Sequence, residues 1–189
     1  TCIGDWHYNR GLFDNHQYKS AASVIHRLAD IVSKNGNLLL SIPVRGDGTI
    51  DADERRFLET MAEWMGRNGE AIYGTRPWRS FGEGPTRVAS GMFSEGQAQS
   101  FTAQDIRFTT KDGALYAIAL GWPTSGVLRI AALAQDSALA PGAIERVEVP
   151  GSRDSLPFTR SRNGLEVRLP DGLAGSMAVA LKIRGSGLV

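Results

Sequence analysis

The sequence predicts an α/β region followed by an all-β region. Over residues 1–80, two amphipathic helical patterns flank a continuous apolar run, a combination typical of α/β proteins. After about Pro85 the helical periods end, and short segments rich in Val, Ile, Phe and Thr alternate with turns. We therefore expect residues 1–80 to be the end of a larger α/β sheet or barrel, and residues 85–189 to form an antiparallel β-sandwich.

The first helix is expected to begin at Ser20. Its apolar positions recur every three or four residues and would form one buried stripe. They are Val24, Ile25, Leu28, Ile31 and Val32. The stretch Lys34-Asn35-Gly36 follows, and either Asn35 or Gly36 can supply the left-handed residue that ends a helix.

The apolar run "NLLLSIP" comes next. Its leucines and isoleucine, at residues 38–42, do not alternate with polar residues, which predicts a strand buried on both faces, as in a parallel sheet. Such a strand needs a neighbour on each side, because unpaired backbone groups inside a core are costly. Residues 1–80 contain no second convincing parallel strand. The chain is therefore expected to be the C-terminal piece of a longer protein.

A turn and a second helix complete the first region. The stretch "VRGDGT" predicts a tight turn in which Asp47 bonds its own backbone, and its spacing fits neither a phosphate-binding loop nor a calcium loop. Asp51 and Glu54 have the spacing of a capping box, which predicts the start of a helix. The apolar stripe of this helix is Phe57, Leu58, Met61, Trp64 and Met65. Asn68-Gly69 is expected to end it.

The second region contains two clear hairpins. The segments "QDIRFTT" and "ALYAIALGW" flank a turn at residues 111–113, and "LPFTRS" and "LEVRLP" flank a turn in which Asn163-Gly164 can adopt positive φ. Further strand candidates are "GVLRIAAL", "AIERVEVP" and "MAVALKI". Segments of this length and spacing predict two packed antiparallel sheets.

The composition fits a globular protein of one or two domains. Hydrophobic residues make up 42% of the 189 residues, and the formal net charge is +1, so no global field favours nucleic acid or an anionic membrane surface. No apolar run approaches the roughly 20 residues of a membrane-spanning helix. With Cys2 as its single cysteine, the chain forms no internal disulfide and no multi-cysteine zinc site, and the compartment stays open.

Polar, aromatic and titratable residues crowd the opening run "TCIGDWHYNRG", which has no helical or strand period. In an α/β barrel, irregular chain ahead of a helix lies on the active-site face, so we expect a site here. Trp6 and Tyr8 can pack against the apolar C–H face of a sugar while their polar tips bind its hydroxyls. The alternative is that Trp6 only plugs the rim of the barrel. Among the three histidines, only His7 lies in this run of polar and aromatic residues, where a site is expected.

Other chemistries are weaker candidates for this run. Asp5 and Asp14 are the acids near it, but both flank turn-forming residues, so a role in surface turns is favoured over a pair of catalytic carboxylates. Cys2 lies near His7 in the sequence, which alone does not make a thiol–histidine dyad. The histidines also lack the spacing of a metal site.

Several segments together resemble a known family. They are "TCIGDWHYNRG", "LADIVSKNGNLLLSI", "DGTI", "NGEAIYGTRPW" and "DIRFTTKDGALYAIALGWP". In this order, over roughly residues 1–125, they resemble the C-terminal half of α-L-fucosidases of glycoside hydrolase family 29. The similarity continues more loosely to "ALKI" at residues 180–183. The succession of "SKNGNLLL" and "NGEAIYGTRPW" is the specific part of the resemblance.

The resemblance implies a (β/α)8-like catalytic barrel, of which residues 1–70 would be the last elements, followed by a C-terminal β-sandwich. Members of the family remove α-L-fucose with retention through a covalent fucosyl-enzyme, and no metal or organic cofactor is needed. Trp6 and Tyr8 match the family's W-x-Y, whose Trp borders the fucose pocket, while His7 stands where many members have Gly. The resemblance puts both catalytic carboxylates before Thr1, so none is assigned in this chain.

Two functions are therefore considered. The first is the C-terminal portion of a retaining α-L-fucosidase that acts on fucosylated glycans, completed by an N-terminal segment or by another chain of the same enzyme, without nucleic-acid or membrane partners. The second is a non-catalytic carbohydrate-binding or subunit-interaction module. An exposed aromatic row on the sandwich would favour the second, and Trp78 and Trp122 are its candidates, although both also fit packing at a domain interface.

Overall fold

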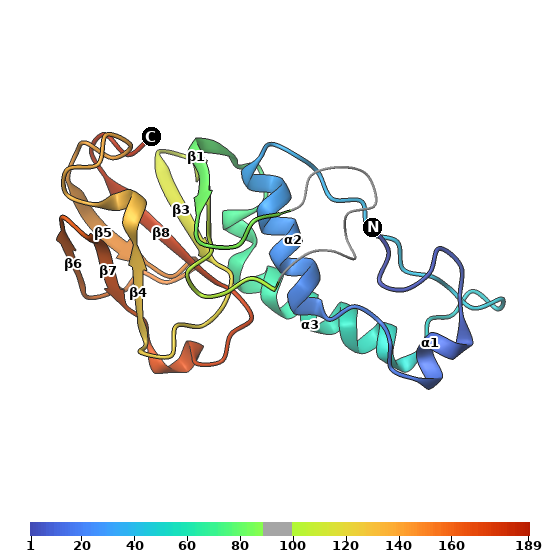
Figure 1. Cartoon of the computed structure of the whole chain (residues 1–189). Helices are drawn as coiled ribbons and strands as arrows, with labels where there is room; N and C mark the ends of the chain where they lie inside the picture. The colour runs from blue at the N-terminus through green and yellow to red at the C-terminus, as the bar shows by residue number, and fades with distance from the viewer. Residues whose placement is uncertain (89–99) are drawn as a thin grey trace.

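The computed structural model describes residues 1–88 and 100–189. An irregular opening segment leads through helices into a region of strands (Figure 1). The α-helices are α1 (Arg10–Asp14), α2 (Ala21–Ser33) and α3 (Ala52–Asn68). In the part of the chain that is described, no helix is long and apolar enough to cross a membrane. The predicted order, an α/β region followed by an antiparallel β region, is confirmed.

Two antiparallel sheets make up the β region. The larger sheet has the strand order β1-β2-β3-β8-β5, and the smaller has the order β4-β7-β6. Their strands are β1 (Arg76–Glu83), β2 (Ile106–Lys111), β3 (Ala114–Ala119), β4 (Val127–Ile130), β5 (Ile144–Glu148), β6 (Phe158–Ser161), β7 (Gly164–Arg168) and β8 (Val179–Gly185). Both hairpins expected from the sequence, β2 with β3 and β6 with β7, are present.

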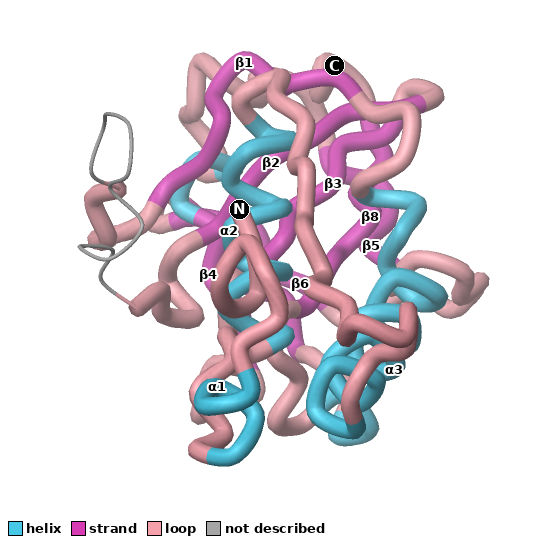
Figure 2. The backbone as a smooth tube through the Cα atoms, turned by 90° about the vertical axis from the view of Figure 1, so that its right-hand side faces the viewer, coloured by secondary structure: helices cyan, strands magenta, loops and turns pink. Residues whose placement is uncertain are grey.

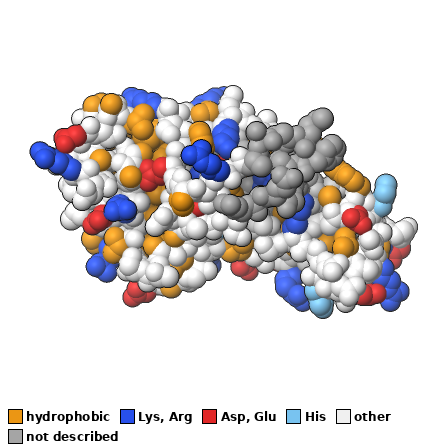
Figure 3. Space-filling view, viewed as in Figure 1, with side chains coloured by type: hydrophobic (Ala, Val, Ile, Leu, Met, Phe, Trp, Pro, Cys, Tyr) orange, Lys and Arg blue, Asp and Glu red, His pale blue; other side chains and the backbone are white. Residues whose placement is uncertain are grey.

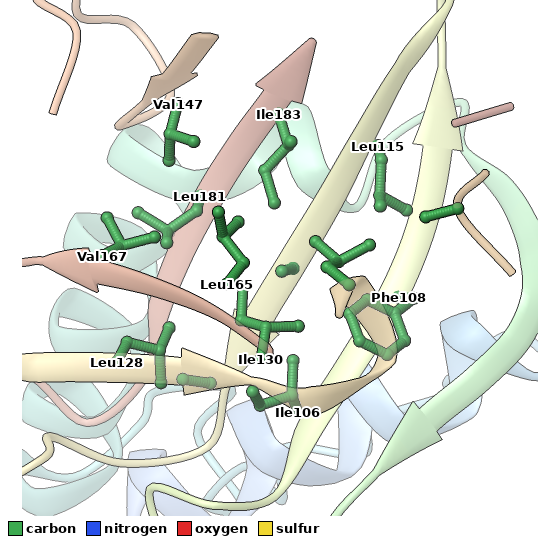
Figure 4. Packing of buried hydrophobic residues seen from close by; sticks show 14 of the residues in the cluster. Ile106, Phe108, Leu115, Leu128, Ile130, Val147, Leu165, Val167, Leu181 and Ile183 are labelled. Atoms are coloured by element: carbon green, nitrogen blue, oxygen red, sulfur yellow. The ribbon is translucent and has the colours of Figure 1, made fainter. Parts of the chain in front are cut away.

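The inner faces of the two sheets enclose one hydrophobic core (Figure 4). Phe108 and Ile183 enter it from the larger sheet, and Ile130 and Val167 enter it from the smaller one, each fully buried. Burial of such a side chain contributes roughly 1.5–3 kcal/mol to stability. The alternation of apolar and polar residues in these strands places their apolar side chains on this shared face.

The outer face of the larger sheet is covered by α2 and α3. Ile25 of α2 and Trp64 of α3 pack with Tyr116 and Ile118 of β3 in a second core. Because both faces of the sheet are covered, all six residues of β3 are buried. The smaller sheet, the larger sheet and the helix pair therefore form three successive layers (Figure 1).

A buried ion pair joins α2 to the larger sheet. Nε of Arg107 in β2 lies 2.6 Å from Oδ1 of Asp30, and the two side chains are only 3% and 9% exposed. Lys34 lies 2.8 Å from the other oxygen of Asp30. The Arg107 guanidinium also lies 5.1 Å from the ring of Phe101 and 5.6 Å from that of Phe81. These contacts fix the position of α2 on the sheet.

The ends of both long helices follow the sequence signals. The Ser20 hydroxyl accepts a hydrogen bond from the Ser23 N–H at the start of α2, and Asn35 takes the left-handed conformation beyond its end. At α3, Asp51 and Glu54 form the predicted capping box.

The prediction for residues 38–42 is wrong. These residues form no strand and make a single parallel bridge, between Cys2 and Ser41. Leu38 and Leu40 pack against the small cluster around Ile3, whereas Leu39 is 83% exposed. The continuous apolar pattern predicted two covered faces, but in the described part of the chain only one face has neighbours.

Strand β1 was not expected from the sequence. It is an edge strand containing Pro77 and Gly82, and its pairing with β2 shifts register between these residues. A Cβ at Gly82 would lie 2.4 Å from the carbonyl oxygen of Ile106, so the close approach of the two strands requires glycine there. The boundary between the two regions, expected between residues 80 and 85, stays a prediction.

Candidate functional site

Two loops lie side by side at the candidate site. The backbone N–H of Ile3 donates to the Ser41 carbonyl (3.2 Å), and the N–H of Ser41 donates to the Thr1 carbonyl (2.9 Å), so residues 1–3 and 41 run parallel. The loops that follow, at residues 4–18 and 43–50, leave this pair at the same carboxyl edge. In α/β barrels this edge carries the functional groups.

The opening loop is anchored at its base. Ile3 is fully buried in a cluster with Val24 of α2 and Phe57 of α3. A Cβ at Gly4 would lie 2.8–2.9 Å from side-chain atoms of Leu12 and Tyr18, so only glycine permits this turn without a shift. The backbone of this anchored loop lies on the side of the molecule that faces the viewer in Figure 2.

The predicted sugar-binding residues project from this loop. Trp6 is 66% exposed, and His7 is also exposed. Tyr8 is half-buried, and its hydroxyl accepts a long hydrogen bond of 3.4 Å from Nε of Arg45. Trp6 thus has an accessible apolar surface in this chain, and Tyr8 is held by the neighbouring loop.

Arg45 was not identified as a site residue from the sequence. Its guanidinium lies 5.7 Å from the ring centres of both Tyr8 and Phe13, so it joins the two loops. The turn that carries it closes as predicted, because the Asp47 carboxylate accepts hydrogen bonds from both the N–H and the hydroxyl of Thr49. These bonds lower the pKa of Asp47. Only the "RGDGT" turn signalled this residue in the sequence.

The acids near the opening loop are all engaged locally. Asp5 accepts a hydrogen bond from the Asn9 amide (2.8 Å), and Asp14 pairs with Arg10 at 3.4 Å on an exposed helix surface. Asp5 lies in irregular chain, as expected for a turn residue, whereas Asp14 is the last residue of helix α1 rather than part of a turn. Acidic and basic side chains are interspersed over the face shown in Figure 3, so this face has no patch of a single charge.

Glu70 lies elsewhere, against the outer face of the larger sheet. It accepts hydrogen bonds from the Tyr116 hydroxyl (2.7 Å) and from Lys182. The bond from Lys182, followed by that from Tyr116, lowers the pKa of Glu70. Both bonds reach the same oxygen and favour the ionised form, which suits a structural role better than that of a proton donor.

The remaining reactive residues form no site of their own. The Cys2 thiol donates to the carbonyl of Gly4 (2.6 Å), and no hydrogen bond joins it to His7. His26 is half-buried and contacts the Met177 carbonyl, and burial lowers its pKa. His16 contacts Asp53 at 2.6 Å. Within residues 1–88 and 100–189, no cluster of His, Cys, Asp and Glu could hold a metal ion.

The aromatic row that would mark a binding module is not formed by Trp78 and Trp122. Trp78 is 7% exposed, and its indole N–H donates to the Leu188 carbonyl (2.6 Å). Trp122 is partly buried against the same core between the sheets. On the smaller sheet, Glu166 of β7 is paired with Arg129 and Thr159 on the flanking strands, so this row is polar.

The chain is similar to known proteins over most of its length. A family model described as α-L-fucosidase matches residues 1–70, and one described as the α-L-fucosidase C-terminal domain matches residues 97–184. The plasma α-L-fucosidases of Pongo abelii and Homo sapiens are 35% and 34% identical over 170 residues, which is 87% of this chain. The chain belongs to the α-L-fucosidase family. It spans 31% of the length of each of these relatives.

A solved fucosidase has the same fold. The crystal structure of a Thermotoga maritima α-fucosidase in complex with fucose is 30% identical, covers 97% of this chain and superposes with a TM-score of 0.70, while the chain covers 38% of that structure. This match extends through both the opening loops and the two sheets. The solved fucosidase therefore contains elements beyond those that match this chain.

Proposed function

We propose that the protein hydrolyses terminal α-L-fucose from glycans with retention, and that this chain is the C-terminal portion of the enzyme. The observation that supports this most is its similarity to plasma α-L-fucosidases over 87% of the chain. A shared fold does not by itself fix an activity, so the proposal also depends on the chemistry of the opening loop.

Trp6, Tyr8 and His7 would bind the sugar. The exposed indole of Trp6 would cover the apolar face of fucose, which carries a methyl group in place of a hydroxymethyl group. The Tyr8 hydroxyl already accepts from Arg45, which has no acceptor capacity, so its own proton is available to a sugar hydroxyl. His7 would add a further hydrogen bond from the exposed side of the loop.

The two reacting carboxylates would come from outside this sequence. In a retaining reaction one carboxylate attacks the anomeric carbon while a carboxylic acid protonates the leaving oxygen, and water then releases the sugar. Asp5, Asp14 and Glu70 each have a local partner, so none is favoured for either role. Strands of an N-terminal segment or of a separate chain would cover Leu39 and complete the barrel around residues 38–42.

The proposal is tested with a chimera. The 189-residue chain alone is expected to show no turnover of an aryl α-L-fucoside. Joined behind the preceding part of the Thermotoga maritima enzyme, at the start of the region that superposes, it is expected to hydrolyse this substrate. In the chimera, Trp6→Ala should raise KM about tenfold or more, whereas Tyr73→Ala, an exposed aromatic outside the site, should leave KM unchanged.

If the isolated chain hydrolysed the aryl fucoside, the catalytic carboxylates would have to lie within it, which contradicts the proposal. A folded chimera that binds fucosides but does not hydrolyse them would contradict the proposed function. An active chimera whose KM is unchanged by Trp6→Ala would contradict the proposed role of Trp6.

A further inference from the structure

A groove of about 540 Å³ lies on the side of α3, away from the opening loop. One wall is the face of α3 from Thr60 to Asn68, and the other consists of the turn after β5, at residues 149–151, and the segment 172–179 that leads into β8. The walls are tied together at the base, because the Trp64 indole N–H donates to the Ala178 carbonyl (2.9 Å). This volume is within the range of small-molecule sites.

Asn68 is a polar residue that lines this groove. Its side chain is 8% exposed, and its amide nitrogen donates to the Trp64 carbonyl (3.0 Å). That bond fixes the orientation of the amide, so the oxygen must point the other way. Among the described residues, nothing donates a hydrogen bond to this oxygen. The only buried side-chain oxygen without a partner among the described residues is Oε1 of Glu54, so the Asn68 oxygen is open to water, which a ligand hydroxyl can replace.

Two opposite charges border the groove without neutralising each other. Glu63 and Arg67 lie one turn apart on α3, both exposed, and neither forms an ion pair within residues 1–88 and 100–189. Among the residues that the structure describes, they are the only charged side chains that line the groove, and their charges cancel. A neutral ligand with many hydroxyl groups can use both, since the guanidinium only donates and the carboxylate only accepts.

The opposite wall leaves room for such a ligand. Gly151, Gly172 and Gly175 line it, and a Cβ added at any of them would meet nothing within 4 Å. The edge of Trp64 and the apolar atoms of Pro150 and Met177 supply surface for the C–H groups of a sugar ring.

From this combination we propose that the groove is a second carbohydrate site, separate from the opening loop, which binds one neutral saccharide unit of a glycan. The amide oxygen of Asn68 and the carboxylate of Glu63 accept from its hydroxyls, and the guanidinium of Arg67 donates to its oxygens. The site would hold a glycan on the C-terminal region, independently of the chemistry at the opening loop.

The test uses the 189-residue chain labelled with 15N and titrated separately with lactose and with L-fucose. One of the two sugars should shift the side-chain amide signals of Asn68 and the backbone signals of Gly151 and Gly175 in a saturable manner. Glu63→Ala and Arg67→Ala should each weaken this binding about tenfold. Glu59→Ala and Arg55→Ala, exposed positions of the same helix outside the groove, serve as matched controls and should not change it.

Several outcomes would overturn the proposal. No shift at the groove with either sugar, or shifts that persist in Glu63→Ala and Arg67→Ala, would exclude this site. Shifts of the same signals on changing protein concentration without sugar would assign the groove to a second copy of the chain. If fucose shifts only Trp6, His7 and Tyr8 and lactose shifts nothing at the groove, the second site is excluded and the proposed function is supported. Shifts confined to the groove would instead support the second site and count against sugar binding at the opening loop.

Discussion

The β region and the opening region differ in how completely they cover their own apolar surface. In β3 all six residues are buried, because one face meets the smaller sheet and the other meets α2 and α3. In the opening region Leu39 is 83% exposed, Trp6 66% and Val44 53%. Both regions contain continuous apolar runs. The comparison shows that such a run becomes a buried strand only where the chain also supplies its neighbours.

The largest expected effect is a difference in unfolding free energy between a variant of the β region and a variant of the opening region. Phe108→Ala removes a fully buried ring from the core between the sheets and should lower the free energy of unfolding by about 3–5 kcal/mol. Leu39→Ala, at an exposed position, should change it by less than about 0.5 kcal/mol. Urea unfolding of both variants measures the difference. Equal losses would mean that residues 38–42 are buried in the chain.

A second effect concerns the contact between the regions. Arg107→Met leaves Asp30 buried with only Lys34 as a charged partner and should cost about 3 kcal/mol of unfolding free energy. Arg162→Met, which removes an exposed pair with Asp136, should cost less than about 1 kcal/mol. A loss in Arg107→Met no larger than in Arg162→Met would show that the buried pair does not hold α2 on the sheet.

Much of this architecture is predictable because its signals are local. Ser20 and Asp51 mark helix starts through hydrogen bonds to residues two or three positions away, and the hairpin strands alternate along their own length. The wrong prediction, at residues 38–42, concerned burial, which depends on elements distant in the sequence. Strand β1 was missed because Pro77 and Gly82 interrupt its pattern, although an edge strand tolerates both.

The candidate site also contains residues that local sequence signals predict and residues that they do not. Trp6 and Tyr8 could be predicted as site residues because their residue types suit a sugar and their segment precedes a helix, and their role stays a prediction. Arg45 was missed because its contact with Tyr8 spans 37 residues and two loops, and nothing in the turn "RGDGT" indicates a neighbour. The Asn68 oxygen was also hidden from sequence reasoning, since its orientation follows from a bond to the preceding helical turn.

A smaller effect concerns the start of α3, which borders the opening loop. Asp51 accepts hydrogen bonds from the N–H groups of Asp53 and Glu54, and also from the Tyr18 hydroxyl (2.7 Å). Asp51→Ala should lower the unfolding free energy by about 1–2 kcal/mol. Asp51→Asn keeps an acceptor for the helix and should recover most of the loss in thermal or urea unfolding. If Asp51→Asn is as unstable as Asp51→Ala, the cap is not the cause.

The smallest effects are opposite pH dependences of two glutamates. Bonds from Lys182 and Tyr116 lower the pKa of Glu70, so its contribution is present above the ordinary pKa of 4.5 and is lost as pH falls through the lowered value. Burial raises the pKa of Glu83 despite bonds from Ala132 and Ala131, so its contribution is present below 4.5 and is lost as pH rises through the raised value.

Unfolding free energies of wild type, Glu70→Gln and Glu83→Gln across roughly pH 3–7 test these signs. The advantage of wild type over Glu70→Gln should shrink on acidification, whereas its advantage over Glu83→Gln should shrink as pH rises. Parallel pH profiles for the two variants would refute the assignment.

The central claim, that the opening loop is a sugar-binding edge, is tested most directly by titrating L-fucose while following tryptophan fluorescence. Trp6 is 66% exposed, whereas Trp64 and Trp78 are only 5% and 7% exposed and Trp122 is partly buried, so the main change should arise at Trp6. Because Trp64 lines the proposed groove, the titration uses proteins that carry Glu63→Ala, which weakens binding there. In this background a saturable change is predicted with Trp6 intact and with Tyr73→Ala added, and its loss is predicted when Trp6→Ala is added. No change with Trp6 intact, or a change that persists with Trp6→Ala, would contradict the account.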